Sequence, residues 1–236
     1  MLIDPTESRA DVASVRAGAV ALLTALRPKQ WLKNLFVFAP ALFAGDLFVE
    51  SAMARAAAAF AIFCAVSSAT YLLNDILDRE ADRQHPLKRY RAIASGQVST
   101  SAAVVVAALL AASGLGAATA FGLEFAVFVL AYLVTTVAYT LYFKHAVILD
   151  VMILAAGFVM RVLAGAAVVP VPASEWLLLC TLLLAIFLGL AKRRHELTVL
   201  EQGATNHRRV LMHYSPELLD QMTVIVATAA ILCYIL

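Results

Sequence analysis

Residues 71–96 read YLLNDILDREADRQHPLKRYRAIASG and change from apolar to acidic to basic along the chain. One carboxamide and three carboxylates recur here at helical spacing: Asn74, Asp75, Asp78 and Asp82. On a continuous helix these side chains share one broad face, where the like charges repel unless water or a cation separates them. A hard divalent ion such as Mg²⁺ takes oxygen ligands and is usually shared with a substrate phosphate. The pattern predicts such a metal site; the alternative is a solvated helix end beside a membrane span.

The chain as a whole is strongly apolar. Of its 236 residues, 63% are hydrophobic and 14% are charged, and its mean hydropathy is +0.86. Long apolar runs that recur along such a chain predict an all-α, polytopic membrane helix bundle. The three cysteines lie inside apolar runs, which argues against a disulfide framework. The N-terminal residues mix acidic and basic side chains, so we expect no secretory signal.

Seven apolar segments predict membrane spans. They cover approximately residues 28–44, 55–82, 100–121, 125–143, 148–169, 175–191 and 216–236. Pro40 is expected to kink the first span or to stop it early. The preceding apolar piece, residues 17–26, is too short to cross a bilayer, so it either lies along the membrane interface or packs beneath the bundle. We therefore expect an N-terminal segment, residues 1–26, followed by one transmembrane domain, residues 27–236.

The distribution of charge predicts the orientation of the spans. Lysine and arginine gather at the start of the first span, after the second, at Lys144 and after the sixth. The loops on the opposite side hold mainly acidic residues, and Arg55 is their only base. The positive-inside rule then places the N-terminus, the acidic array and the basic segments in the cytoplasm.

The fifth predicted span carries charges inside an apolar segment. Asp150, Gly157, Arg161 and Gly165 fall on nearly one face of this helix. Glycine at such a spacing lets another helix approach closely. Arg161 lies about 16 Å along the helix from Asp150 at a rise of about 1.5 Å per residue, and an arginine at that depth needs a partner. A carboxylate of the acidic array and a substrate phosphate are both open.

The pattern Asn74-Asp75-x-x-Asp78-x-x-x-Asp82 resembles the first signature of the UbiA superfamily of intramembrane prenyltransferases. Two basic segments, residues 27–34 (RPKQWLKN) and 83–91 (RQHPLKRYR), more closely resemble one branch, the decaprenyl-phosphate phosphoribosyltransferases. The resemblance runs from about residue 27 to residue 236. It implies a UbiA-type bundle of nine helices, of which this sequence would hold seven, so we expect the chain to be cut off at its C-terminus.

The resemblance also implies a reaction. The enzyme would transfer 5-phosphoribosyl from 5-phosphoribosyl diphosphate (PRPP) to a polyprenyl phosphate such as decaprenyl phosphate. The product would lead to lipid-linked arabinose donors for cell-wall arabinogalactan, and the enzyme would lie in the cell membrane with its active site facing the cytoplasm. Mg²⁺ held by Asp75, Asp78 and Asp82, the expected catalytic carboxylates, would bridge the leaving diphosphate.

Further polar side chains are expected to bind the substrates around the same chamber. They are Lys29, Lys33, Asn74, Lys88, Arg89, Arg91, Tyr142, Arg161, Lys192, Arg193 and Glu196. Lys29 and Lys33 could instead extend to the membrane interface, and Tyr142 could belong to the interfacial aromatic belt.

Residues 192–196 (KRRHE) depart from the superfamily pattern, in which a second aspartate-rich motif follows the sixth span. One acidic and one basic cluster suit a metal-bound diphosphate beside a further phosphate. Two other functions stay open: prenyl transfer from a prenyl diphosphate to an aromatic acceptor, and membrane transport. The first calls for a second acidic cluster, and the second for charges on both sides of the membrane. We expect no nucleic-acid partner, and a homo-oligomer is left open.

Overall fold

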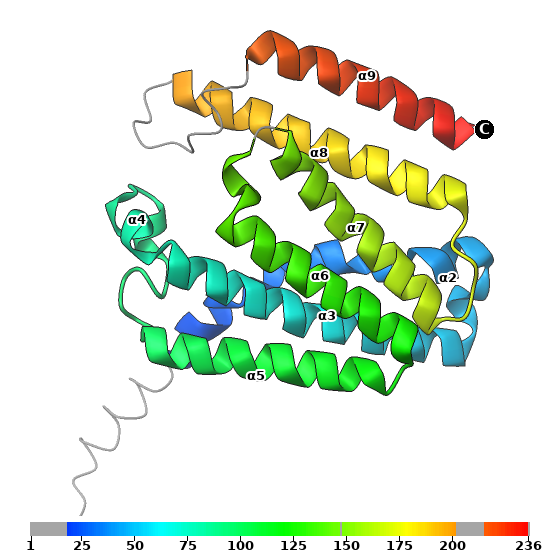
Figure 1. Ribbon diagram of the computed structural model, residues 1–236, viewed down its shortest axis with the longest axis horizontal. Coiled ribbons are helices and arrows are strands. Elements are labelled where there is room, and N and C mark those ends of the chain that lie inside the picture. The colour runs from blue at the N-terminus through cyan, green and yellow to red at the C-terminus, as the bar shows by residue number, and fades with distance from the viewer. Residues whose placement is uncertain (1–17, 147, 202–214, 236) are drawn as a thin grey trace, which may run out of the picture. The chain divides into compact units, whose positions relative to one another are not determined.

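A computed structural model describes residues 18–146, 148–201 and 215–235, and every regular element in these ranges is a helix. Six helices are long and apolar enough to cross a membrane. They are α3 (Glu50–Leu77), α5 (Thr100–Thr119), α6 (Leu123–Leu141), α7 (Leu149–Val168), α8 (Glu175–Glu201) and α9 (Pro216–Ile235) (Figure 1). The prediction of an all-α, multi-pass membrane protein is confirmed.

The first predicted span takes a different form. The chain forms a 3₁₀ helix, η1 (Pro28–Phe38), which passes directly into a short α-helix, α2 (Ala39–Ala44). Pro40 lies in the first turn of α2, where a missing N–H costs little because first-turn N–H groups have no partner in the helix. The prediction that Pro40 stops the helix early is wrong, because α2 continues to Ala44, and the alternative of a kink stays a prediction. The helix ends instead at Gly45, whose φ of 81° is readily adopted by glycine.

Helix α8 extends beyond the predicted sixth span. It was expected to end near residue 191, but it continues through residues 192–196 to Glu201. Its 27 residues rise about 1.5 Å each, about 40 Å in all, which exceeds the roughly 30 Å hydrocarbon core of a bilayer. The basic residues therefore lie on the last turns of a helix that is long enough to project from the membrane.

The chain divides into two compact units. Unit 1 consists of Met1–Leu32 and Cys64–Gly114, and unit 2 consists of Lys33–Phe63 and Leu115–Leu236. Helix α3 belongs to both, because the division falls between Phe63 and Cys64.

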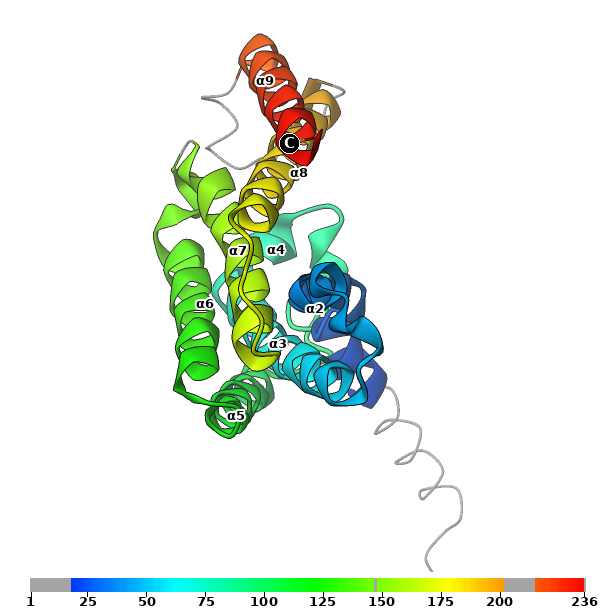
Figure 2. The ribbon, with the colours of Figure 1, turned by 90° about the vertical axis from the view of Figure 1, so that its right-hand side faces the viewer.

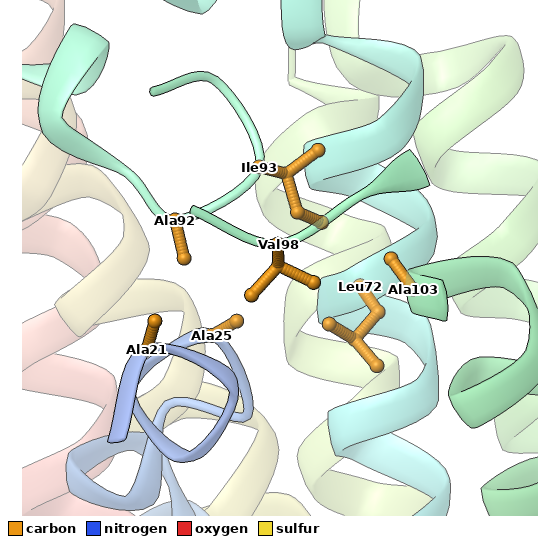
Figure 3. Close-up of a cluster of buried hydrophobic side chains, with 7 residues drawn as sticks. All are labelled: Ala21, Ala25, Leu72, Ala92, Ile93, Val98 and Ala103. Carbon is orange, nitrogen blue, oxygen red and sulfur yellow. The ribbon is translucent and has the colours of Figure 1, made fainter. Parts of the chain in front are cut away.

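In unit 1 the apolar N-terminal piece packs onto the helices. Residues 18–25 are helical, and their Ala21 and Ala25 are buried in a cluster with Leu72 of α3 (Figure 3). Ile93 and Val98, from the loop between α4 (Arg79–Gln84) and α5, join the same cluster. These contacts match the packing alternative for this piece, and its placement along the membrane interface stays a prediction. The alanines allow its backbone to approach closely.

In unit 2, α6 to α9 pack in chain order, with α8 lying between α7 and α9 (Figures 1 and 2). Two glycines allow close contacts. Gly189 of α8 faces Val151 of α7, whose Cγ1 would lie 2.7 Å from an added Cβ. Gly165 of α7 lies against the backbone carbonyl of Val37 in η1. The predicted role of Gly165 in close packing matches this contact, whereas a Cβ at Gly157 would find ordinary clearance.

Replacing Gly165 by alanine is expected to destabilise the protein. A Cβ would collide with the backbone of Val37, which cannot turn away as a flexible side chain can. Overpacking of this kind typically costs about 1–3 kcal/mol. Thermal unfolding in detergent should show a lower midpoint for Gly165→Ala. The matched control is Gly116→Ala, where no atom lies within 4 Å of an added Cβ. Equal midpoints for both variants would contradict the packing described here.

Candidate functional site

The acidic array in unit 1 lies on two helical segments. Helix α3 ends at Leu77, and Asp78 (φ −89°, ψ 3°) precedes α4. Helical hydrogen bonds nevertheless continue across the break, because the Asp78 N–H donates to the Asn74 carbonyl (2.9 Å) and the Asp82 N–H to the Asp78 carbonyl (2.8 Å). Because α3 ends at Leu77 and α4 begins only at Arg79, the expectation of one regular helix through residue 82 is wrong. Short polar side chains such as Asp favour such breaks because they compete for backbone hydrogen bonds.

Two buried carboxylates of the array converge on one arginine. Arg91 Nη1 lies 3.1 Å from Asp75 Oδ1 and 2.6 Å from Asp82 Oδ2. Both aspartates are almost inaccessible to solvent, whereas the Arg91 side chain is 29% exposed. A single guanidinium nitrogen thus occupies the point at which two carboxylates meet.

A second arginine, which sequence reasoning missed, reaches the same site. Arg27 Nη2 donates a hydrogen bond to Asp75 Oδ1 (2.5 Å), and the guanidinium stacks over the ring of Tyr71 at 5.2 Å. The backbone of Arg27 has a φ of 55°, which is strained for a residue with a Cβ. Its only sequence signal was its position at the start of the basic segment 27–34.

A cavity of about 470 Å³ opens beside these ion pairs. Its apolar wall comes from the N-terminal helical piece and from Ala92, and its polar wall includes Arg27, Asp75 and Arg91. Tyr90 and Gln97 also line it. A volume of this size falls in the range of about 300–1,000 Å³ that is usual for small-molecule sites. The acidic array thus adjoins a space that could hold a small anionic ligand.

Whether the acidic array can bind a metal ion depends on the position of the Arg91 side chain. Within residues 18–146, 148–201 and 215–235, no three Asp, Glu, His or Cys side chains are grouped closely enough to hold a metal ion. The donor set still suits a hard divalent ion, since Asp75 and Asp82 direct oxygens to one point and Asn74 and Asp78 lie within the same two turns. Asp75 and Asp82 could hold a metal together only after Arg91 has moved.

The other predicted residues of unit 1 lie at its surface. Lys29, Lys88 and Arg89 are exposed, and Arg89 donates a hydrogen bond to the hydroxyl of the neighbouring Tyr90 (2.7 Å). Arg83 Nε donates to the carbonyl of Ala94 (3.1 Å) and so ties the loop before α5 to α4. Their predicted contacts with substrate stay predictions.

In unit 2, Arg161 is buried among neutral groups. Its guanidinium donates hydrogen bonds to Asn34 Oδ1 (2.8 Å), the Gly157 carbonyl (2.7 Å) and the Tyr132 hydroxyl (2.9 Å). The rings of Phe63, Tyr132 and Phe158 surround it, with centroids 5.9, 4.5 and 5.5 Å away. The expected partner was a carboxylate or a phosphate. Sequence reasoning missed this neutral cage because Asn34, Tyr132 and Phe63 lie on other helices, far from Arg161 in sequence.

Arg193, expected to bind substrate, is buried. Its side chain is 0% exposed, and its Nε lies 3.0 Å from Asp150 Oδ2. Its Nη1 pairs with Glu196 one turn along α8. These ion pairs link the start of α7 to α8 and give Arg193 a structural role in this arrangement. Its predicted contact with substrate stays a prediction.

The remaining predicted residues of unit 2 are accessible. The Lys192 side chain is 61% exposed and lies 3.9 Å from Glu196. Lys33 and Tyr142 are also exposed. Arg194 pairs with Asp220 (2.9 Å) and so connects α8 to α9. Because the acidic array and residues 192–196 belong to different units, their meeting in one chamber stays a prediction.

The family model of the UbiA prenyltransferase family matches residues 18–236. A protein of Mycolicibacterium smegmatis named decaprenyl-phosphate phosphoribosyltransferase is 36% identical over 217 residues, which cover 90% of this chain and 68% of that protein. Proteins of the same name from Corynebacterium glutamicum and Mycobacterium tuberculosis are 36% and 34% identical, over 92% and 94% of this chain and 67% and 74% of their own lengths.

The fold is similar to that of a solved structure. The structure of a UbiA homolog from Archaeoglobus fulgidus bound to GPP and Mg²⁺ has a TM-score of 0.75 and 17% sequence identity, and the match covers 91% of this chain and 76% of that one. At this identity the likeness concerns the fold alone. Together with the family match over residues 18–236, it leads to one conclusion: the chain belongs to the UbiA prenyltransferase family.

Proposed function

We propose that this protein transfers 5-phosphoribosyl from PRPP to a polyprenyl phosphate and releases diphosphate. One observation carries the proposal: Arg27, Asp75 and Arg91 line a single cavity, where both arginines pair with Asp75. Arg91 also pairs with the buried Asp82. Such a site can hold a cation on its carboxylates and phosphate groups on its guanidiniums. The relatives named decaprenyl-phosphate phosphoribosyltransferase support the same donor and acceptor.

In the proposed reaction an oxygen of the acceptor phosphate bonds to C1 of the ribose. The bond between C1 and the diphosphate oxygen breaks, and the diphosphate leaves with the bonding electron pair. The acceptor phosphate is ionised at neutral pH, so no side chain has to remove a proton. The residues of the chain act mainly by positioning and by electrostatic stabilisation.

Each group at the cavity has a proposed role. Asp75 and Asp82, together with Asp78, would hold Mg²⁺, which when bound neutralises charge on the leaving diphosphate. Arg27 and Arg91 would hold phosphate oxygens through paired hydrogen bonds, a geometry for which the guanidinium is suited. The apolar wall formed by Val20, Ala21, Ala25 and Ala92 would exclude water from the reacting atoms.

The test of this proposal is direct transfer by the purified protein. The protein in detergent is incubated with Mg²⁺, decaprenyl phosphate and PRPP labelled in its ribose. We expect label to enter the lipid fraction in a one-to-one ratio with released diphosphate. Release of diphosphate from geranyl diphosphate with an aromatic acceptor, and none from PRPP, would instead identify a prenyltransferase.

We further infer that the cavity faces the cytoplasm of the cell membrane. The positive-inside rule supports this, because the two basic segments 27–34 and 83–91 are predicted to be cytoplasmic, and Arg27 and Arg91 of these segments line the cavity. Gln97 is exposed and lines the cavity, so a Gln97→Cys variant without the three native cysteines reports on both features. It should react only with thiol reagents that enter cells, and PRPP with Mg²⁺ should slow its labelling in membranes. Labelling from outside would contradict the orientation.

A further inference from the structure

Two arginines of this protein each lie between two carboxylates, a position that a metal cation could otherwise occupy. Arg91 closes the carboxylate pair Asp75 and Asp82 in unit 1. Arg193 closes the carboxylate pair Asp150 and Glu196 in unit 2. In each case one guanidinium contacts two acidic side chains, and in unit 1 Arg27 also pairs with Asp75. The surroundings of Arg91 and Arg193 differ.

The difference lies in access. The Arg193 side chain is 0% exposed, and no other group can take its place without unpacking α7 from α8. The Arg91 side chain is 29% exposed and lines the 470 Å³ cavity. Its guanidinium can therefore turn toward a ligand in that cavity.

Hydrogen bonds hold the backbone around Arg91, whereas its side chain borders the cavity. The Arg91 N–H donates to the Lys88 carbonyl (2.9 Å), and the Arg91 carbonyl accepts from the Ser95 N–H (2.8 Å). The following residues Ala92 to Ala94 are buried. A change of partner at Arg91 thus requires side-chain rotation and no rearrangement of the loop.

The balance of charge at the site determines when it is favourable for the Arg91 guanidinium to change its partner. Arg27 and Arg91 already balance Asp75 and Asp82, so a divalent ion that enters alone adds two positive charges beside two guanidiniums. Like charges at contact distance repel, most strongly where water is excluded. A divalent ion that enters with a diphosphate removes this excess, and the diphosphate offers oxygens to the displaced guanidinium.

We propose that Arg91 is an internal cation that exchanges with the divalent metal. It holds Asp75 and Asp82 together while the cavity is empty, and it turns to the phosphate groups of the donor when metal and donor enter together. The metal and the diphosphate group therefore bind cooperatively, each raising the affinity for the other by the same factor. This role rests on the proposed function only for the identity of the donor, because any diphosphate presents the same oxygens.

The test measures metal binding and needs no turnover. Mn²⁺ binding to the purified protein in detergent is followed by electron paramagnetic resonance, with and without inorganic diphosphate. For the wild type we expect weak binding of Mn²⁺ alone, and at least tenfold tighter binding when diphosphate is present. For Arg91→Gln we expect Mn²⁺ alone to bind at least tenfold more tightly than to the wild type, and the effect of diphosphate to shrink correspondingly.

Arg83→Gln is the matched control, because it removes one positive charge in the same unit from an exposed side chain that pairs with Glu80. Its affinity for Mn²⁺ should stay close to that of the wild type. Equal Mn²⁺ affinity in Arg91→Gln and Arg83→Gln would overturn the proposal. If Arg91→Gln does not fold, the measurement on the wild type is sufficient. Equal Mn²⁺ affinity of the wild type with and without diphosphate would overturn the proposed exchange. Inorganic diphosphate keeps this test separate from the identity of the donor, which the transfer assay addresses.

Discussion

The Asp75→Asn variant is expected to lose at least about 100-fold in kcat/KM for PRPP. Asp75 is the carboxylate that both Arg27 and Arg91 contact, and its side chain faces the cavity. Asparagine has nearly the same shape but no charge, so it weakens the proposed hold on the metal and leaves both guanidiniums with less compensation. A metal contributes several kcal/mol to such a transfer, and about 1.4 kcal/mol corresponds to a tenfold change in rate.

The measurement is initial velocity over a range of PRPP concentrations, with far-ultraviolet circular dichroism as the check on folding. Glu80→Gln is the matched control, because Glu80 is exposed on α4 and contacts the half-buried Arg79 and the exposed Arg83. It should keep wild-type kinetics. A chelator in excess should abolish activity in the wild type, and added Mg²⁺ should restore it. Wild-type activity in Asp75→Asn would remove this carboxylate from the mechanism.

The second large effect concerns stability. Asp150→Leu should lower the free energy of unfolding by about 3–5 kcal/mol, the usual cost of leaving one partner of a buried ion pair uncompensated. Arg193 would remain fully buried with Glu196 as its remaining partner. Thermal unfolding in detergent should show a markedly lower midpoint for this variant.

The double variant Asp150→Leu/Arg193→Met separates a structural role from a substrate-binding one. Apolar residues of similar volume often replace a buried ion pair without loss of stability. The double variant should therefore regain most of the stability that Asp150→Leu loses, and its KM for PRPP should stay close to the wild-type value. A large rise in KM in a stable double variant would show that Arg193 contacts the donor after all.

Much of the fold was predictable because a segment that crosses the membrane as a helix has to be long and apolar. The spans at α5 and α7 were predicted to within a few residues from apolar runs bounded by polar ones. The 3₁₀ helix η1 was not predicted, because residues 28–38 carry no pattern that separates it from an α-helix. The extension of α8 to Glu201 was not predicted either. Composition shows where an apolar segment ends, but it does not show where the helix that contains it ends.

The candidate site was predictable only in part. Asp75, Asp82 and Arg91 lie close together in sequence and were expected to act in one place, and the structure brings them together. Arg27 was missed because its contact with Asp75 depends on the packing of the N-terminal helical piece. Arg193 was assigned to substrate because its neighbours Lys192 and Arg194 are also basic. Its burial follows from a pairing with α7 that sequence spacing does not reveal.

We propose that PRPP binds in the cavity bordered by Arg27, Asp75 and Arg91. Calorimetric titration of PRPP into the wild-type protein in detergent with Mg²⁺ tests this binding, and Arg27→Gln provides the comparison. We expect saturable binding of PRPP to the wild type at one site. Loss of one charged hydrogen bond, worth about 1.5–3 kcal/mol, should weaken binding to Arg27→Gln about ten- to a hundredfold. The absence of saturable PRPP binding to a folded wild-type protein that does bind geranyl diphosphate would contradict the account.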